Sequence, residues 1–151
     1  MSLTRRETLI LGIGAAALAT AGLRSSPVLA AAEDTQAMIM EFTGGKEPES
    51  GRITLNAPEI AENGNTVPIS VSVDSPMTAD DYVEQVIVLA EGNPNPGVVV
   101  FAFSPLSGSA DASTRMRLAK TQNVVAVAKM KDGSVFMDKR EVKVTIGGCG
   151  G

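Results

Sequence analysis

The sequence predicts an all-β protein, an antiparallel β-sandwich of immunoglobulin type with about seven strands. In several runs between residues 53 and 146, apolar residues recur at every second position, which is the spacing of half-buried strands. Gly, Pro and Asn separate these runs at short intervals, and no alternation of strands with long helices is visible. Because aromatic residues make up only 3% of the chain and tryptophan is absent, the core has to be aliphatic.

Residues 1–32 are expected to be an export signal rather than part of the folded domain. Arg5 and Arg6 precede an apolar stretch at residues 9–19, and small residues follow it. A positive start, an apolar middle and a small-residue end are the parts of a secretory signal. The paired arginines favour the twin-arginine route into the periplasm, although Thr8 stands where an apolar aromatic residue is more usual.

Charge and composition exclude several classes of function. The signal carries three arginines and one glutamate, so its removal changes the net charge from −4 to −6. An acidic domain is a poor match for nucleic acid or for an anionic membrane surface. The complete absence of histidine excludes Ser-His-Asp and Cys-His catalysis, histidine zinc sites and blue-copper sites. We therefore expect no catalytic residue, no metal and no cofactor.

The mature domain, residues 33–146, is expected to begin with a short amphipathic helix from Glu33 to Phe42. Asp34 and Thr35 are possible N-caps, and Gly44 follows where the helix ends. Strands are then expected at 53–56, 67–73, 83–90, 98–103, 113–118, 124–130, 135–137 and 142–146.

Turn residues separate these strands. Asn93-Pro94-Asn95-Pro96-Gly97 is a strong turn segment, and Asp132-Gly133 predicts a hairpin. Pro68 has no backbone N–H to donate, so it belongs at the start of its strand or on a sheet edge.

Two charged pairs have a structural and a functional interpretation. Arg115 and Arg117 alternate on a strand and could bind an anion, but solvated strand arginines are the favoured account. Asp80 and Asp81 are interpreted as a loop end rather than a catalytic carboxylate pair, because no neighbouring sequence supplies an apolar pocket that would raise a pKa.

The C-terminal segment contains the only cysteine, Cys149, between Gly147-Gly148 and Gly150-Gly151. Glycine has no Cβ, so such a run has little intrinsic structure, and we expect residues 147–151 to be a flexible arm. With the last strand ending at Ile146, three extended residues would carry the thiol about 10 Å beyond the sheet.

The single thiol allows two functions. In the first, it carries a covalently bound substrate to other enzymes, which must activate it because an ordinary thiol has a pKa of about 8.5 and no cation flanks it. In the second, the exported sandwich is structural and Cys149 forms only an intermolecular disulfide, since one cysteine has no internal partner.

The chain resembles the SoxY family of thiosulfate-oxidation carrier subunits over essentially all of its mature length. The similarity lies in 60–68 (IAENGNTVP), 75–77 (SPM), 93–96 (NPNP), 113–118 (STRMRL) and the terminal GGCGG. The resemblance implies an immunoglobulin-like sandwich that pairs with a SoxZ subunit and is not itself a catalyst. It further implies that the haem enzyme SoxAX joins thiosulfate oxidatively to Cys149. SoxB would then hydrolyse the sulfone end, and SoxCD, where present, would oxidise the remaining sulfane sulfur.

Overall fold

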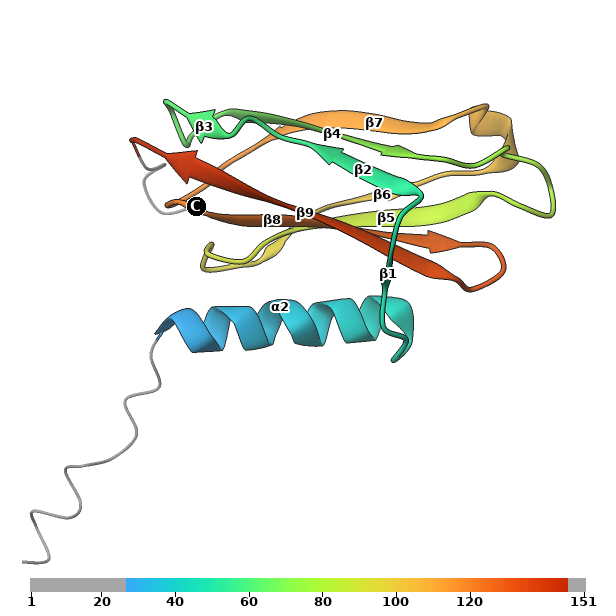
Figure 1. Ribbon diagram of the computed structural model, residues 1–151, viewed down its shortest axis with the longest axis horizontal. Helices are drawn as coiled ribbons and strands as arrows, with labels where there is room; N and C mark the ends of the chain where they lie inside the picture. The colour runs from blue at the N-terminus through green and yellow to red at the C-terminus, as the bar shows by residue number, and fades with distance from the viewer. Residues whose placement is uncertain (1–26, 147–151) are drawn as a thin grey trace, which may run out of the picture.

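The computed structural model describes residues 27–146, with side chains from residue 32 onward. Two β-sheets pack face to face, and one helix lies across the outer face of the larger sheet (Figure 1). The predicted β-sandwich is confirmed. Among the described residues, no helix is long and apolar enough to cross a bilayer.

Helix α2 extends from Pro27 to Thr43, so the predicted start at Glu33 was wrong. Asp34 and Thr35 lie inside the helix instead of capping it, and Thr35 is buried. The physical reason is that alanine is the best helix former and proline is well suited to a first helical position, so the small residues assigned to the signal also favour a helix. The predicted signal and the helix therefore overlap at residues 27–32.

The apolar side of α2 packs on the larger sheet and thereby fixes the helix to the domain. Ile39 is 5% exposed and belongs to a second core cluster together with Ile87, Leu89, Val125 and Val127. The helix ends as predicted, where Gly44 and Gly45 adopt φ values of 68° and 87°. The N–H of Gly45 then donates to the carbonyl of Met40 at 2.8 Å, which satisfies a C-terminal helix carbonyl.

The larger sheet has six strands, of which five follow the order β1-β9-β8-β5-β6. Their bounds are β1 Glu49–Ser50, β9 Val135–Val144, β8 Gln122–Met130, β5 Val83–Ala90 and β6 Gly97–Ala102. The sixth, β3 (Ile60–Ala61), pairs with the end of β9 in parallel. The predicted turn at 93–97 and the hairpin at Asp132-Gly133 join the antiparallel pairs β5–β6 and β8–β9.

The smaller sheet contains β2 (Ile53–Asn56), β4 (Val67–Val73) and β7 (Ala110–Met116) in the order β2-β4-β7. A short 3-10 helix, η1 (Pro105–Ser107), lies between β6 and β7. Pro68 is the second residue of β4. It has no partner in β2, because the pairing of β2 with β4 ends at Ser70. The prediction for this proline is therefore confirmed.

The space between the sheets is filled by aliphatic side chains, as the composition predicts. In β4, buried and more exposed positions alternate as Val67, Ile69, Val71 and Val73 turn inward. The fully buried residues of this core come from both sheets and one loop and include Leu55, Val86, Leu118 and Val124.

Seven strands have four or more residues, in agreement with the prediction, while β1 and β3 have two each. The strand order is compatible with the two sheets of an immunoglobulin-like sandwich. The predictions for the last strand were wrong in two respects. β9 continues without interruption from Val135 to Val144, and it ends at Val144 rather than Ile146.

The charged middle of β9 remains a strand because its side chains make bonds across the sandwich. Asp138 accepts a hydrogen bond from the Leu55 backbone N–H at 2.9 Å, and Arg140 Nε donates to the Leu55 carbonyl at 3.3 Å. These two side chains therefore satisfy the backbone N–H and carbonyl of Leu55 at the outer edge of β2. Polar residues at these positions interrupt the alternation of apolar residues by which a strand is predicted, but they do not interrupt the strand itself.

Candidate functional site

The residues predicted to form the arm, namely Cys149 with Gly147, Gly148, Gly150 and Gly151, lie outside the described residues. The description ends at Ile146, three residues before the thiol. It therefore defines the base from which the C-terminal segment departs and the surface around that base.

The end of β9 is held by the segment that contains β3. The backbone N–H of Lys143 donates to the Glu59 carbonyl at 2.9 Å, and that of Thr145 donates to the Ala61 carbonyl at 3.1 Å. The Thr145 hydroxyl also donates to the Glu62 carbonyl at 3.2 Å. Although the strand has ended at Val144, the backbone remains bonded for two further residues.

Gly64 links the end of the described chain to the rest of the domain. Its N–H donates to the Ile146 carbonyl at 2.9 Å, and its carbonyl accepts a hydrogen bond from the Leu118 N–H at 2.8 Å. Leu118 is completely buried, so this bond connects the last described residue to the hydrophobic core. On the other side of β9, the Thr121 hydroxyl accepts a hydrogen bond from the Val144 N–H at 2.9 Å. Position 146 is thus fixed to the rest of the domain.

Sequence reasoning missed Gly64, Thr121 and a polar network built on Asn93 and Gln122. The Asn93 side-chain oxygen accepts hydrogen bonds from the Ala119 N–H at 3.0 Å and from Gln122 Nε2 at 2.9 Å. Gln122 is itself 7% exposed. This network holds the 93–97 turn against the loop that contains Thr121. No periodicity or spacing in the sequence pairs these residues, although the Asn-Pro repeat marks the turn.

An open groove of about 930 Å³ lies on the outer face of the smaller sheet. Its floor includes a cross-strand row of hydrogen-bonding residues, Asn56, Ser70 and Ser113, and beside it the pair Pro68 and Arg115. Asn56 is the final residue of β2, while the other four residues come from the first half of β4 and the second half of β7, with Ser70 and Ser113 at the middle of their strands. Figure 1 shows β3 and the end of β9 at this same end of the sandwich.

The two arginines considered as anion ligands are both exposed but differ in their surroundings. Arg115 lines the groove. Arg117 does not, and its backbone carbonyl accepts a hydrogen bond from Asn93 Nδ2 at 2.8 Å. Within residues 27–146, the Arg115 side chain has neither a hydrogen bond nor an ion pair.

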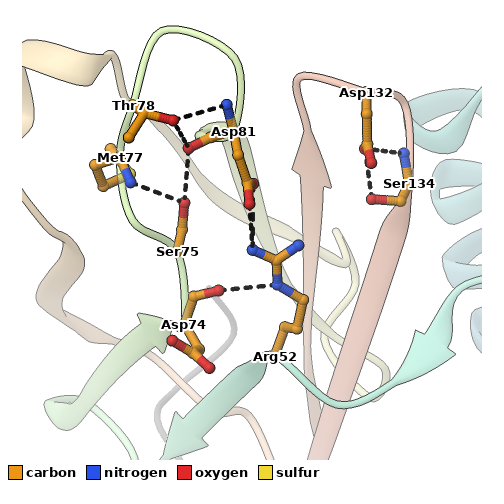
Figure 2. Close-up of polar contacts among 8 residues, drawn as sticks. All are labelled: Arg52, Asp74, Ser75, Met77, Thr78, Asp81, Asp132 and Ser134. Atoms are coloured by element: carbon orange, nitrogen blue, oxygen red, sulfur yellow. Dashed lines mark hydrogen bonds and ion pairs between the residues drawn. The ribbon is translucent and has the colours of Figure 1, made fainter.

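The carboxylate candidates lie at the other end of the smaller sheet, where β2 begins and β4 ends. Figure 2 shows Arg52 between Asp74 and Asp81, donating to the Asp74 carbonyl at 2.9 Å and forming an ion pair with Asp81 Oδ1 at 3.2 Å. Arg52 has a positive φ of 55°, which these contacts and its position over the Phe136 ring maintain. Asp81 therefore helps to close this end of the fold.

Two exposed aspartates have lowered pKa values because hydroxyl groups bond to their charged forms. The Ser72 hydroxyl, at 2.6 Å, and the Ser109 hydroxyl lower the pKa of Asp111 below 3.8. The hydroxyl and backbone N–H of Ser134, together with weaker contributions from Arg52 and Lys46, lower the pKa of Asp132 below 3.8. Both are local turn or strand interactions, and neither raises a pKa as general acid catalysis would require.

The described part of the chain contains no group of three acidic or cysteine ligands that could hold a metal ion. Every buried side-chain nitrogen and oxygen in residues 32–146 has a hydrogen-bond partner. These residues build a closed, aliphatic sandwich domain with an open, arginine-containing groove on the smaller sheet.

Comparison with known proteins assigns the family. A model of the family described as sulfur oxidation protein SoxY matches residues 39–149, which includes Cys149. The solved structure of the sulfur carrier protein SoxY from Chlorobium limicola f thiosulfatophilum is 36% identical. The match covers 76% of this chain and 99% of that chain, with a TM-score of 0.62. The chain belongs to the SoxY family, as the resemblance in sequence predicted. No match was found among curated proteins.

Other solved structures share the fold alone. A superoxide reductase (neelaredoxin) from Ignicoccus hospitalis is 24% identical, covers 64% of this chain and 82% of its own, and has a TM-score of 0.56. The superoxide reductase from Nanoarchaeum equitans is 11% identical with a TM-score of 0.53, covering 63% of this chain and 99% of its own. At these identities the likeness concerns the sandwich and not its chemistry.

Proposed function

We propose that this protein is a periplasmic carrier of the sulfur substrate in thiosulfate oxidation, with Cys149 as the point of covalent attachment. The observation that carries this proposal is the SoxY family match, which extends to Cys149 itself. The bonds that fix Ile146 support it, because they provide a rigid base three residues before the thiol. The glycines at 147, 148, 150 and 151 leave the sulfur sterically open, so that it can enter a narrow active site.

Attachment of thiosulfate is an oxidation. The thiol R–SH and S₂O₃²⁻ form R–S–S–SO₃⁻ with release of one proton and two electrons. The electrons pass to a haem enzyme of the SoxAX type, and that enzyme must also promote formation of the thiolate because the ordinary thiol pKa is about 8.5. This division of labour agrees with a carrier that has no histidine.

Later steps act on the sulfur that Cys149 carries. Water, directed by a SoxB-type enzyme, breaks the bond between the sulfane sulfur and the sulfonate, which releases sulfate and two protons. A persulfide anion remains on Cys149, and a SoxCD-type dehydrogenase oxidises its outer sulfur. The proposal includes a SoxZ-type partner subunit and export of the folded complex by the segment at 1–32.

The test is intact-mass measurement of the exported protein from thiosulfate-fed cells. We expect thiosulfonate or sulfane adducts on the wild-type protein and none on Cys149→Ser, which should fold normally and abolish thiosulfate turnover. The matched control is Ser109→Ala, an exposed hydroxyl far from the arm in sequence, which should retain the adducts.

The alternative function, a structural sandwich linked through a Cys149 disulfide, predicts a different mass. It would give only a dimer that reductant converts to the monomer, with no sulfur added. Full thiosulfate turnover by Cys149→Ser would exclude the carrier function altogether.

A further inference from the structure

We propose that Asn63 is a site of spontaneous deamidation, and that the hydrogen bond between Gly64 and Ile146 controls its rate. Asn63-Gly64 is the only Asn-Gly pair in the sequence. It lies just beyond β3, in the segment that holds the end of β9. The chemistry uses only described residues of the domain and does not depend on a substrate at Cys149.

Deamidation begins when the backbone nitrogen of the residue after an asparagine attacks the side-chain amide carbon. The new C–N bond closes a succinimide ring, and the side-chain nitrogen leaves as ammonia together with the proton of the attacking N–H. Water then opens the ring at one of its two carbonyl groups, which leaves either aspartate or isoaspartate. Because both products are ionised at neutral pH, the chain gains one negative charge. The reaction needs no oxidant, reductant or enzyme.

The sequence around Asn63 favours this reaction more than the sequence around the other asparagines does. Gly64 has no Cβ that would obstruct ring closure, and glycine reaches backbone conformations that are closed to other residues. Asn93 and Asn95 each precede a proline, which has no N–H. The asparagines at positions 56, 65 and 123 precede alanine, threonine and valine, whose side chains hinder the attack.

The folded domain holds both reacting groups away from each other. The Gly64 N–H donates to the Ile146 carbonyl at 2.9 Å, and Gly64 is buried, although Asn63 beside it is exposed. The Asn63 side-chain oxygen accepts a hydrogen bond from the Asn65 N–H at 2.9 Å, which holds the amide toward Asn65. The attack requires the Gly64 nitrogen to be free, so the rate depends on the fraction of time for which Ile146 is detached.

Isoaspartate at position 63 would in turn release the end of β9. An isoaspartyl link passes the main chain through the former side chain and adds a methylene group before Gly64. The Gly64 N–H is bonded to Ile146 and its carbonyl to the Leu118 N–H, while the Ala61 carbonyl accepts from the Thr145 N–H. The lengthened chain does not fit all three bonds at once. Deamidation therefore converts a fixed end of the domain into a detached one.

The rate of deamidation is measured on the full chain, kept with a reductant in mildly alkaline buffer. Peptide mapping by mass spectrometry quantifies aspartate and isoaspartate at position 63. We expect the chain unfolded in urea to deamidate at least about tenfold faster than the folded chain, because a bonded segment is open for only a small fraction of the time. Thr145→Val removes the hydroxyl bond to the Glu62 carbonyl and should accelerate deamidation of the folded chain about two- to tenfold, the effect of one hydrogen bond on opening.

Thr145→Ser is the matched control, because it keeps the hydroxyl at the same position and should deamidate at the wild-type rate. Hydrogen exchange of the Gly64 amide, followed by NMR, reports the same opening and should accelerate in Thr145→Val by the same factor as deamidation. Isomerisation at Asp132-Gly133, in the turn between β8 and β9, is the internal reference and should not change. Equal rates at Asn63 in the folded and unfolded chains, or a wild-type rate in Thr145→Val, would overturn the proposal and leave the carrier function untouched.

Discussion

At the scale of the residue, Asp132 shows how local hydrogen bonds set an acid's behaviour. Its carboxylate accepts hydrogen bonds from the Ser134 backbone N–H at 2.8 Å and from the Ser134 hydroxyl at 2.6 Å, across the turn that joins β8 to β9. Both bonds favour the charged form, which lowers the pKa of Asp132 below 3.8. The contribution of Asp132 to stability is therefore present above pH 3.8 and is lost as the pH falls through the folded-state pKa.

Ser134→Ala should raise the pKa of Asp132 toward 3.8, because the hydroxyl is the largest cause of the shift. A carboxyl-detected NMR titration measures this directly. Asp111 is the internal control, since its lowered pKa depends on Ser72 and Ser109 and should not move. An unchanged Asp132 pKa in the variant would show that the hydroxyl does not bond to the carboxylate in solution.

Single residues also show what sequence alone can predict. The Asp132-Gly133 turn was predictable because its signal is local, and Gly133 has the positive φ of 81° that such turns favour. The role of Gly64 was not predictable, because its two bonds join Ile146 and Leu118, which are brought together only by the fold. The unusual residue Cys149 was identified from composition alone, and its attachment chemistry stays a prediction.

At the scale of the element, helix α2 depends on the side chains that it places against the sheet. Ile39→Ala should lower the free energy of unfolding by about 2–4 kcal/mol, because it removes a buried side chain from the contact with Ile87 and Val125. Urea denaturation monitored by circular dichroism measures the loss. Gln36→Ala, on the exposed side of the same helix, should change stability by no more than about 0.5 kcal/mol.

The elements differ in how much the sequence determines them. β4 and β5 were predicted to the residue, because their alternating or continuous apolar patterns directly reflect burial on one or both faces. The start of α2 was not, because the alanine-rich sequence that predicted an export signal also favours a helix. The middle of β9 was missed because Asp138 and Arg140 bond to Leu55 of the other sheet, and such partners are invisible in a single sequence.

At the scale of the whole molecule, the edges of the two sheets differ in how well they are protected from pairing with another chain. The outer edge of β9 is covered by β1 and β3. At the outer edge of β2, the side chains of Asp138 and Arg140 bond to the backbone of Leu55. β6 is an end strand of its sheet, its sequence GVVVFA has no charge or proline, and Val100 within it is 51% exposed. Unprotected apolar edges promote pairing with other chains.

The isolated protein should therefore self-associate at high concentration, and Val100→Lys should reduce this because a charged residue blocks edge pairing. Sedimentation velocity over a concentration series measures the effect. Thr54→Lys, which adds the same charge at an exposed position of β2, is the control and should leave association unchanged. A wild-type chain that stays monomeric throughout the series would contradict the expectation.

The parallel pairing of β3 with the end of β9 has a mechanical consequence. In the carrier function proposed above, an enzyme that held a substrate on Cys149 would pull on the end of β9 through Ile146. Because β3 runs in the same direction and is anchored in the domain, the load acts on several hydrogen bonds at once, in shear, rather than peeling them apart one by one. Under such a load, the pairing of β3 with β9 would therefore protect this end of the domain from unravelling.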